Sequence, residues 1–222
     1  MIRAVFFDAH DILYYRLEPL NRTVAGLMRA RGYAPELTPK DAVSMRELEG
    51  RASIGAATPW DYWGERLRLH GVSDPKERRT LIRQILQQVH RIAPMSQAAE
   101  ALGALKQRGF RLGVVTNTMY PLHWKKRWLR TAGVGRFIDI ISCSTVVGAV
   151  KPDPRIYLDA LAQAHVAPSE AAFVGHDDDE LVGARAVGMV TVAVRPDGGA
   201  AVDYEVRQLT DLLTLPPFQR PQ

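Results

Sequence analysis

Apolar, β-branched stretches alternate with helical segments through the second half of the chain, and this alternation limits the fold more than any other feature. The strand-like stretches cover residues 110–115, 137–142, 171–174 and 190–194. Segments with apolar residues three and four apart precede or separate them, at residues 97–107, 121–131, 155–165 and 181–187. Such alternation predicts an α/β fold with a parallel sheet.

The first half of the chain has a different pattern. Residues 1–7 form one more apolar, strand-like stretch, and then helical periodicity takes over at residues 20–31, 40–51, 59–70 and 75–91. Successive helices without an intervening strand indicate an inserted, all-helical subdomain. We therefore predict an α/β core made of residues 1–15 and 93–222, with residues 16–92 forming a helical cap over Asp8.

Polar residues follow four apolar stretches at matching points, after residues 5–7, 112–115, 146–150 and 173–174. They are Asp8, the pair Thr116 and Asn117, Lys151, and the segment 175–180. In a parallel sheet, ligands bind outside the carboxyl ends of the strands. These residues are therefore expected to meet in one pocket.

The residue types in this set favour nucleophilic chemistry. A carboxylate such as Asp8 can attack phosphorus or carbon when a cation offsets the charge of the incoming anion. Lys151 would supply that cation, and Thr116 would donate its hydroxyl and backbone amide to an oxyanion. The acids from Asp177 to Glu180 would either anchor Mg²⁺ or favour the positive N-terminus of a following helix.

Charge and composition narrow the classes of partner. The net charge is +5, and all of the excess lies between Arg16 and Arg91, among apolar residues and not in a basic tail. We expect a small anionic substrate and no nucleic acid. No apolar run is long enough to span a membrane and no signal segment opens the chain, so a cytoplasmic protein without a membrane partner is expected. Cys143 is the only cysteine. The oligomeric state stays open.

Four short motifs, in order, resemble those of the haloacid dehalogenase superfamily, in the branch with a helical cap after the first motif. They read FFD at residues 6–8, VVTN at 114–117, GAVKPDP at 148–154, and VG at 174–175 followed by GARAVG at 183–188. The resemblance implies a Rossmann-like core and an Asp8 nucleophile that forms a covalent aspartyl intermediate. It also implies that Thr116 binds phosphoryl oxygens and that Lys151 stabilises the charge.

The chain departs from the family pattern at two positions. His10 stands where the family's phosphatases usually carry a second aspartate, and His176 stands where the first metal-binding acid is usual. Imidazole can donate a proton and then activate water, so His10 is a candidate general acid and base. Alternatively, the two histidines mark a site that has lost its activity.

The sequence also leaves open which residues would bind a metal ion. Asp8, the carbonyl of His10 and either Asp177 or His176 are the candidate ligands for Mg²⁺, and nitrogen ligands would favour another divalent metal. Asn117 would either contact substrate or hold its own loop.

The sequence thus predicts a hydrolase of a small anionic substrate, foremost a phosphate monoester. Asp8, His10, Thr116 and Lys151 would be catalytic, and Thr116, Asn117 and Lys151 would bind substrate. The alternatives are a degenerate binding protein and a metal-independent dehalogenase.

Aromatic residues in two predicted helices have a simpler interpretation. Trp60 and Trp63 are expected in the core of the cap. Trp124 and Trp128 predict a buried stripe, with Lys125 and its basic neighbours on a solvated face. The proline-rich C-terminal tail is expected to be frayed.

Overall fold

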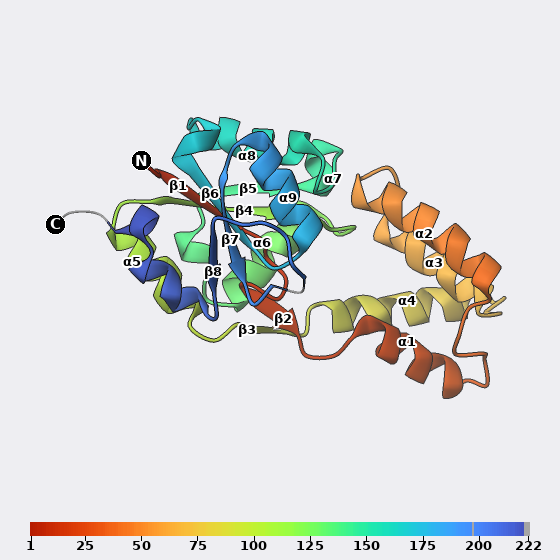
Figure 1. Ribbon diagram of the computed structural model, residues 1–222. Helices are drawn as coiled ribbons and strands as arrows, with labels where there is room; N and C mark the ends of the chain where they lie inside the picture. Colours follow the sequence, from red (N-terminus) through yellow and green to blue (C-terminus); the bar gives the residue numbers. More distant parts are fainter. Residues whose placement is uncertain (197, 220–222) are drawn as a thin grey trace.

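The computed structural model describes residues 1–196 and 198–219. Within this range a sheet of six parallel strands forms the centre of the molecule, in the order β5-β4-β1-β6-β7-β8 (Figure 1). The strands are β1 (Ala4–Phe7), β4 (Arg111–Thr116), β5 (Ile140–Cys143), β6 (Ala171–Gly175), β7 (Val190–Val194) and β8 (Tyr204–Val206). The predicted parallel α/β fold is therefore confirmed.

Strand β1 lies in the middle of the sheet because its residues are apolar on both faces. All four are buried, and the strand pairs with β4 on one side and β6 on the other. Phe7 lies opposite Val114 and Val174 in the two neighbouring strands. The residue after Phe7 therefore emerges at the carboxyl edge, between two other strand ends.

Helices cover both faces of this sheet. The apolar faces of α5 (Ala98–Gln107) and α6 (Leu122–Thr131) share one hydrophobic cluster with Phe7, whereas α8 (Pro154–Ala164) and α9 (Asp178–Val187) share a second cluster with Phe6. Successive side chains of a strand point to opposite faces, which explains why Phe6 and Phe7 belong to different clusters. One further short helix, α7 (Ser144–Val147), follows β5.

Four consecutive helices between β1 and β4 form a separate unit, here called the helical insert (Figure 1). They are α1 (Leu20–Arg29), α2 (Pro39–Ser53), α3 (Pro59–Leu69) and α4 (Pro75–Val89). Thr38, Thr58 and Asp74 cap the last three, and each precedes a proline at the first helical position. Such caps satisfy the free N–H groups at a helix start. The helices lie where the sequence predicts them, while the domain boundaries at 16 and 92 stay a prediction.

The insert meets the core in two places. Strands β2 (Tyr14–Arg16) and β3 (Ile92–Pro94) pair antiparallel where the chain enters and leaves it. At its far side, Gly55 approaches the backbone of Thr145 so closely that an added Cβ would lie 2.6 Å from the carbonyl oxygen. Glycine fits here for this reason and because its φ is +77°.

Several local predictions need correction. Strands β2, β3 and β8, which have three residues each, are not among the predicted strands. Trp60 is exposed and does not belong to the core of the insert, although Trp63 does. The described part of the tail, as far as Gln219, is packed and not frayed, because Phe218 is buried against Phe110. Pro221 lies outside the described residues.

Two 3-10 helices follow β8, Leu209–Thr214 and Pro216–Phe218, and two others, Gly135–Phe137 and Pro168–Glu170, lead into β5 and β6. No helix in the described range is both long and apolar enough to cross a membrane. The location of the protein in the cell stays a prediction.

Candidate active site

Asp8 and Lys151 form a buried ion pair at the carboxyl edge of the sheet. The backbone N–H of Asp8 donates to the carbonyl of Val174 at 2.9 Å, which fixes the residue between β1 and β6. Lys151 Nζ lies 2.5 Å from Asp8 Oδ1, and its side chain is fully buried. A second carboxylate, Glu180 Oε2, lies 2.6 Å from the same nitrogen. One ammonium thus holds two carboxylates that are far apart in the sequence.

Asp8, Lys151 and Glu180 shift one another's pKa values. Burial alone would raise the pKa of Asp8, but the adjacent Lys151 outweighs burial and lowers it. The pKa of Lys151 is raised because the two carboxylates outweigh its burial. Burial raises the pKa of Glu180 to about 7, against the lowering effect of Lys151. Asp8 is therefore the ionised carboxylate at neutral pH, as a nucleophile must be.

Asn117 fixes the backbone from which Lys151 extends. Its Oδ1 accepts a hydrogen bond from the Lys151 N–H at 2.8 Å, and its Nδ2 donates to the Lys151 carbonyl at 3.3 Å. The side chain also borders the cavity described below. Asn117 thus holds the loop of Lys151, which the sequence did not predict, and a contact with substrate stays a prediction.

Thr116 ends β4, beside β1, and is buried. Its hydroxyl makes one long contact of 3.4 Å, to the carbonyl of Asn117. Thr118, two residues further on, borders the cavity, and its hydroxyl accepts from the N–H of Tyr120 at 3.0 Å. The structure thus brings Thr116 to the predicted edge, and its role in binding an oxyanion stays a prediction.

His10 follows Asp8 and turns its ring toward the same cavity. Its Nδ1 lies 3.0 Å from Asp11 Oδ2, while its Nε2 is buried without a hydrogen-bond partner among the described residues. Burial lowers the pKa of His10 despite the neighbouring Asp11. A buried ring nitrogen without a partner next to a nucleophile is suited to bind a ligand atom or to exchange a proton with it.

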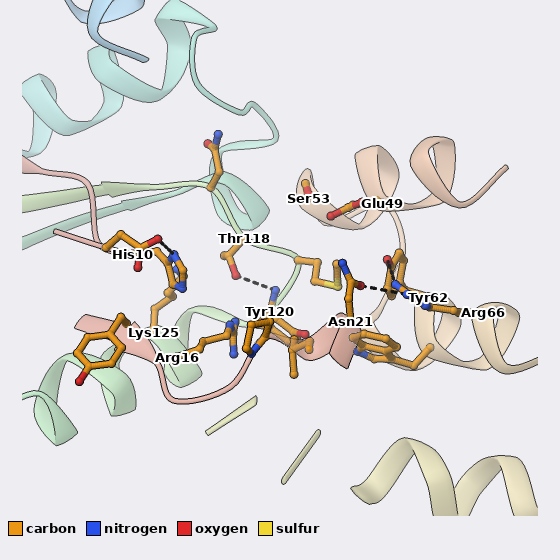
Figure 2. Close-up of a pocket in the computed structure, with 17 residues that line it drawn as sticks. His10, Arg16, Asn21, Glu49, Ser53, Tyr62, Arg66, Thr118, Tyr120 and Lys125 are labelled. Atoms are coloured by element: carbon orange, nitrogen blue, oxygen red, sulfur yellow. Dashed lines mark hydrogen bonds and ion pairs between the residues drawn. The ribbon is translucent and has the colours of Figure 1, made fainter. Parts of the chain in front are cut away.

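A cavity of about 690 Å³ opens between the core and the helical insert. Core residues His10, Thr118 and Lys125 line one side, and Tyr62 and Arg66 of the insert line the other (Figure 2). A space of this size suits a small molecule. Its mixture of cations and aromatic rings suits an anionic one.

Two of the residues predicted to bind a metal lie outside the ion pairs of Lys151. Asp177 is exposed and caps α9 by accepting from the N–H of Glu180 at 3.1 Å. His176 borders a different cavity with Asp11 and Arg195. Among the described residues, no group of three or more His, Cys, Asp or Glu side chains is placed to hold a metal ion. The predicted set has two side chains beside the carbonyl of His10, and one or two carboxylates with water and substrate phosphate can hold Mg²⁺, so this set stays a prediction.

Two residues of the site make contacts that sequence reasoning did not predict. Glu180 was expected either to anchor Mg²⁺ or to favour a helix N-terminus; it lies in the first turn of α9, and its side chain binds Lys151. Helix α9 begins at Asp178, three residues earlier than predicted. Lys125 was assigned to a solvated face and is buried. It lies three and four residues before Trp128 and Leu129, which are also buried, and this helical periodicity could have predicted its burial.

Comparison with known proteins places this geometry in a family. Residues 2–188 match the family described as a haloacid dehalogenase-like hydrolase. The chain belongs to this family. The resemblance in the four motifs is thereby confirmed, and the protein is a hydrolase of the haloacid dehalogenase-like type.

Individual relatives of this hydrolase include different activities. It is 29% identical to glyceraldehyde 3-phosphate phosphatase of Methanopyrus kandleri over 96% of this chain and 91% of the relative. A phosphatase structure of the same family from Thermococcus onnurineus superimposes with a TM-score of 0.67 at 25% identity, covering 96% of this chain and 97% of the other.

A 2-haloacid dehalogenase structure from Pseudomonas syringae superimposes with a TM-score of 0.73 at 24% identity, covering 96% of this chain and 97% of the other. At this level of identity the likeness shows the shared fold.

Proposed function

We propose that this hydrolase cleaves small phosphate monoesters through a phosphoaspartyl intermediate on Asp8. The observation that carries the proposal is the buried contact between Lys151 Nζ and Asp8, beside a cavity shared by the core and the insert. The glyceraldehyde 3-phosphate phosphatase similarity along nearly the whole chain supports a small phosphorylated substrate.

Each step of the reaction has a candidate group. Asp8 attacks phosphorus, and the ester oxygen leaves with the bond electrons and takes a proton from His10. Water then attacks the phosphorus of the acyl phosphate and gives a proton to His10, which regenerates Asp8 and releases phosphate. Lys151 offsets the negative charge of Asp8 and of the phosphoryl group, and Thr116 donates to its oxygens.

Access to Asp8 would depend on the helical insert. Arg66 and Tyr62 face the core residues across the cavity. Movement of the insert as a cap would admit substrate and then exclude water. Specificity would therefore come from insert residues, while the chemistry stays with the core.

Metal dependence is a separate part of the proposal. The family resemblance implies Mg²⁺, and Asp8, the carbonyl of His10 and either Asp177 or His176 are its candidate ligands. The Mg²⁺ requirement stays a prediction, and assays in EDTA, Mg²⁺, Mn²⁺ and Co²⁺ decide it.

The primary experiment measures hydrolysis of p-nitrophenyl phosphate by the native chain and by Asp8→Asn. Asp179→Asn is the matched control, since it removes the same charge from an exposed residue of the nearby α9. Asp8→Asn is expected to abolish turnover and the control to keep it. Turnover that survives Asp8→Asn would rule out the nucleophile, and no turnover by the native chain across a broad phosphate panel would favour the binding protein.

Carbon–halogen cleavage is the second candidate. It is favoured by the contact between Lys151 and Asp8, because a carboxylate can displace halide from carbon with cationic help and without a metal. Release of chloride from 2-chloropropionate, measured beside the phosphate assay, separates the two activities.

A further inference from the structure

Lys125 is a buried lysine that none of the four motifs contains. It extends from α6, and its side chain is 4% exposed, whereas Lys126 and Arg127 beside it are exposed. Lysine is seldom fully buried unless it is paired, because removing an ammonium from water costs several kcal/mol. The buried ammonium of Lys125 therefore needs a partner that offsets the cost of removing it from water.

The surroundings of Lys125 supply only part of that compensation. Nζ donates to the hydroxyl of Tyr14 at 3.1 Å and lies 5.8 Å and 5.3 Å from the ring centres of Tyr14 and Trp128. Within the described chain no carboxylate oxygen is within ion-pair distance of it. Burial lowers the pKa of Lys125 to about 8, with the charge of Asp8 acting in the opposite direction. The ammonium is thus still charged at neutral pH and lacks a full counter-charge.

The two buried lysines approach Asp8 from opposite faces of the sheet. Lys151 Nζ lies 5.4 Å from the ring centre of Phe173, which belongs to the hydrophobic cluster under α8 and α9. Lys125 lies against Trp128, in the cluster under α5 and α6. Lys151 Nζ donates to both Asp8 and Glu180, whereas the hydrogen bond described for Lys125 Nζ is the one to Tyr14, so Lys125 has more of its three donors left for a ligand.

Lys125 also borders the cavity in which substrate would lie. It shares this border with His10, Asn117 and Thr118, all of which follow strand ends (Figure 2). Its positive charge lowers the proton affinity of both Asp8 and His10, which places it within electrostatic reach of the reacting groups.

From this geometry we propose that Lys125 is a substrate-binding residue that contacts the phosphoryl oxygens and, with Lys151, supplies positive charge to them. Tyr14 is its positioning residue. The inference rests on the proposed function for the identity of the anion. It adds a cation from α6 to the site formed by the strand ends.

The test measures the affinity of the purified protein for inorganic phosphate by titration calorimetry at neutral pH in EDTA. Lys125→Met keeps the length of the side chain and removes the charge, and Lys126→Met is the matched control one residue away on the exposed face of α6. Tyr14→Phe keeps the ring and removes only the hydroxyl that orients Lys125.

The native chain and Lys126→Met are expected to bind phosphate equally in EDTA, with Lys125→Met weaker by about tenfold or more and Tyr14→Phe in between. The inference is overturned if Lys125→Met binds phosphate as the native chain does, or if the native chain binds phosphate only with Mg²⁺.

Binding and turnover separate this inference from the proposed function. If phosphate binding depends on Lys125 but the native chain hydrolyses no phosphate ester, the proposed function is wrong and the binding role of Lys125 is supported. If hydrolysis depends on Asp8 but KM and kcat are unchanged in Lys125→Met, the inference about Lys125 is wrong and the proposed function is supported.

Discussion

The side-chain amide of Asn117 makes two hydrogen bonds to the backbone of Lys151, at 2.8 Å to its N–H and 3.3 Å to its carbonyl. These bonds tie the end of β4 to the loop that follows α7. The ammonium of Lys151 is therefore aimed at Asp8 by a residue that belongs to a different motif. The two hydrogen bonds thus join the second motif to the third.

Asn117→Ala is expected to lower kcat by about tenfold or more, because a loosened loop misplaces the cation that faces Asp8. Thermal stability should change little, since the bonds lie at the sheet edge. Gln163→Ala, which removes an exposed amide on α8, serves as control. Steady-state kinetics with p-nitrophenyl phosphate measure the effect, and an unchanged kcat would show that Lys151 needs no such support.

Glu180→Gln is expected to change how stability depends on pH. The pKa of Glu180 is raised from 4.5 to about 7 in the folded chain, so between these values the folded state holds a proton that the unfolded state has lost. Native stability should therefore fall as pH rises through this window, by up to about 3 kcal/mol from this group.

The variant lacks this group, so urea unfolding at several pH values should show a smaller fall between pH 4.5 and about 7 than in the native chain. Equal slopes for the two proteins would contradict the raised pKa.

His10→Gln is expected to affect substrates according to their leaving group. An alkoxide needs a proton in order to leave, whereas p-nitrophenolate does not, so hydrolysis of glycerol phosphate should fall about 100-fold and hydrolysis of p-nitrophenyl phosphate much less. His10→Asp should restore part of the lost rate, because a carboxyl group can also donate. Equal losses on both substrates would assign His10 a role other than proton donor.

Lys125→Met is expected to stabilise the fold while it weakens ligand binding. Removing a buried ammonium should raise the free energy of unfolding at neutral pH by about 1–3 kcal/mol, after the lost hydrogen bond to Tyr14 is counted. Urea denaturation of Lys125→Met and Lys126→Met measures this difference. A destabilised Lys125→Met would indicate that the lysine serves the fold.

The pH dependence provides a second check on Lys125. Its pKa falls from 10.5 to about 8 on folding, so between these values the unfolded chain holds a proton that the folded chain has lost. Native stability should rise with pH across this window, and Lys125→Met should lack this rise. Parallel stability curves for the two proteins would contradict the prediction.

The sequence was informative where the chemistry follows strand ends. Asp8 follows β1 as predicted. The apolar stretch 146–150 before Lys151 is not a strand, because α7 covers Ser144–Val147, and Lys151 contacts Asp8 from the loop after this helix. Helical periodicity could have placed Lys125 on the buried face of α6, because it lies three and four residues before the buried Trp128 and Leu129. Its contact with Tyr14 could not be predicted, because that residue comes from a distant segment.

The fourth motif was harder to interpret for a related reason. Four acids in succession, Asp177 to Glu180, are equivalent in composition, and only the start of α9 at Asp178 determines which of them reaches Lys151. Helix boundaries are decided by capping and tertiary contacts. The short strand β8 and the buried Phe218 were missed because their stability comes from packing against β7 and Phe110.

The central claim is that Asp8 carries the phosphoryl group during turnover. Rapid mixing with substrate, followed by acid quench, borohydride reduction and peptide mass spectrometry, tests it most directly, because borohydride converts an aspartyl phosphate to homoserine. The account predicts homoserine at position 8 in the native chain, only when substrate is present. Turnover with Asp8 left unmodified at every quench time, together with activity in Asp8→Asn, would contradict it.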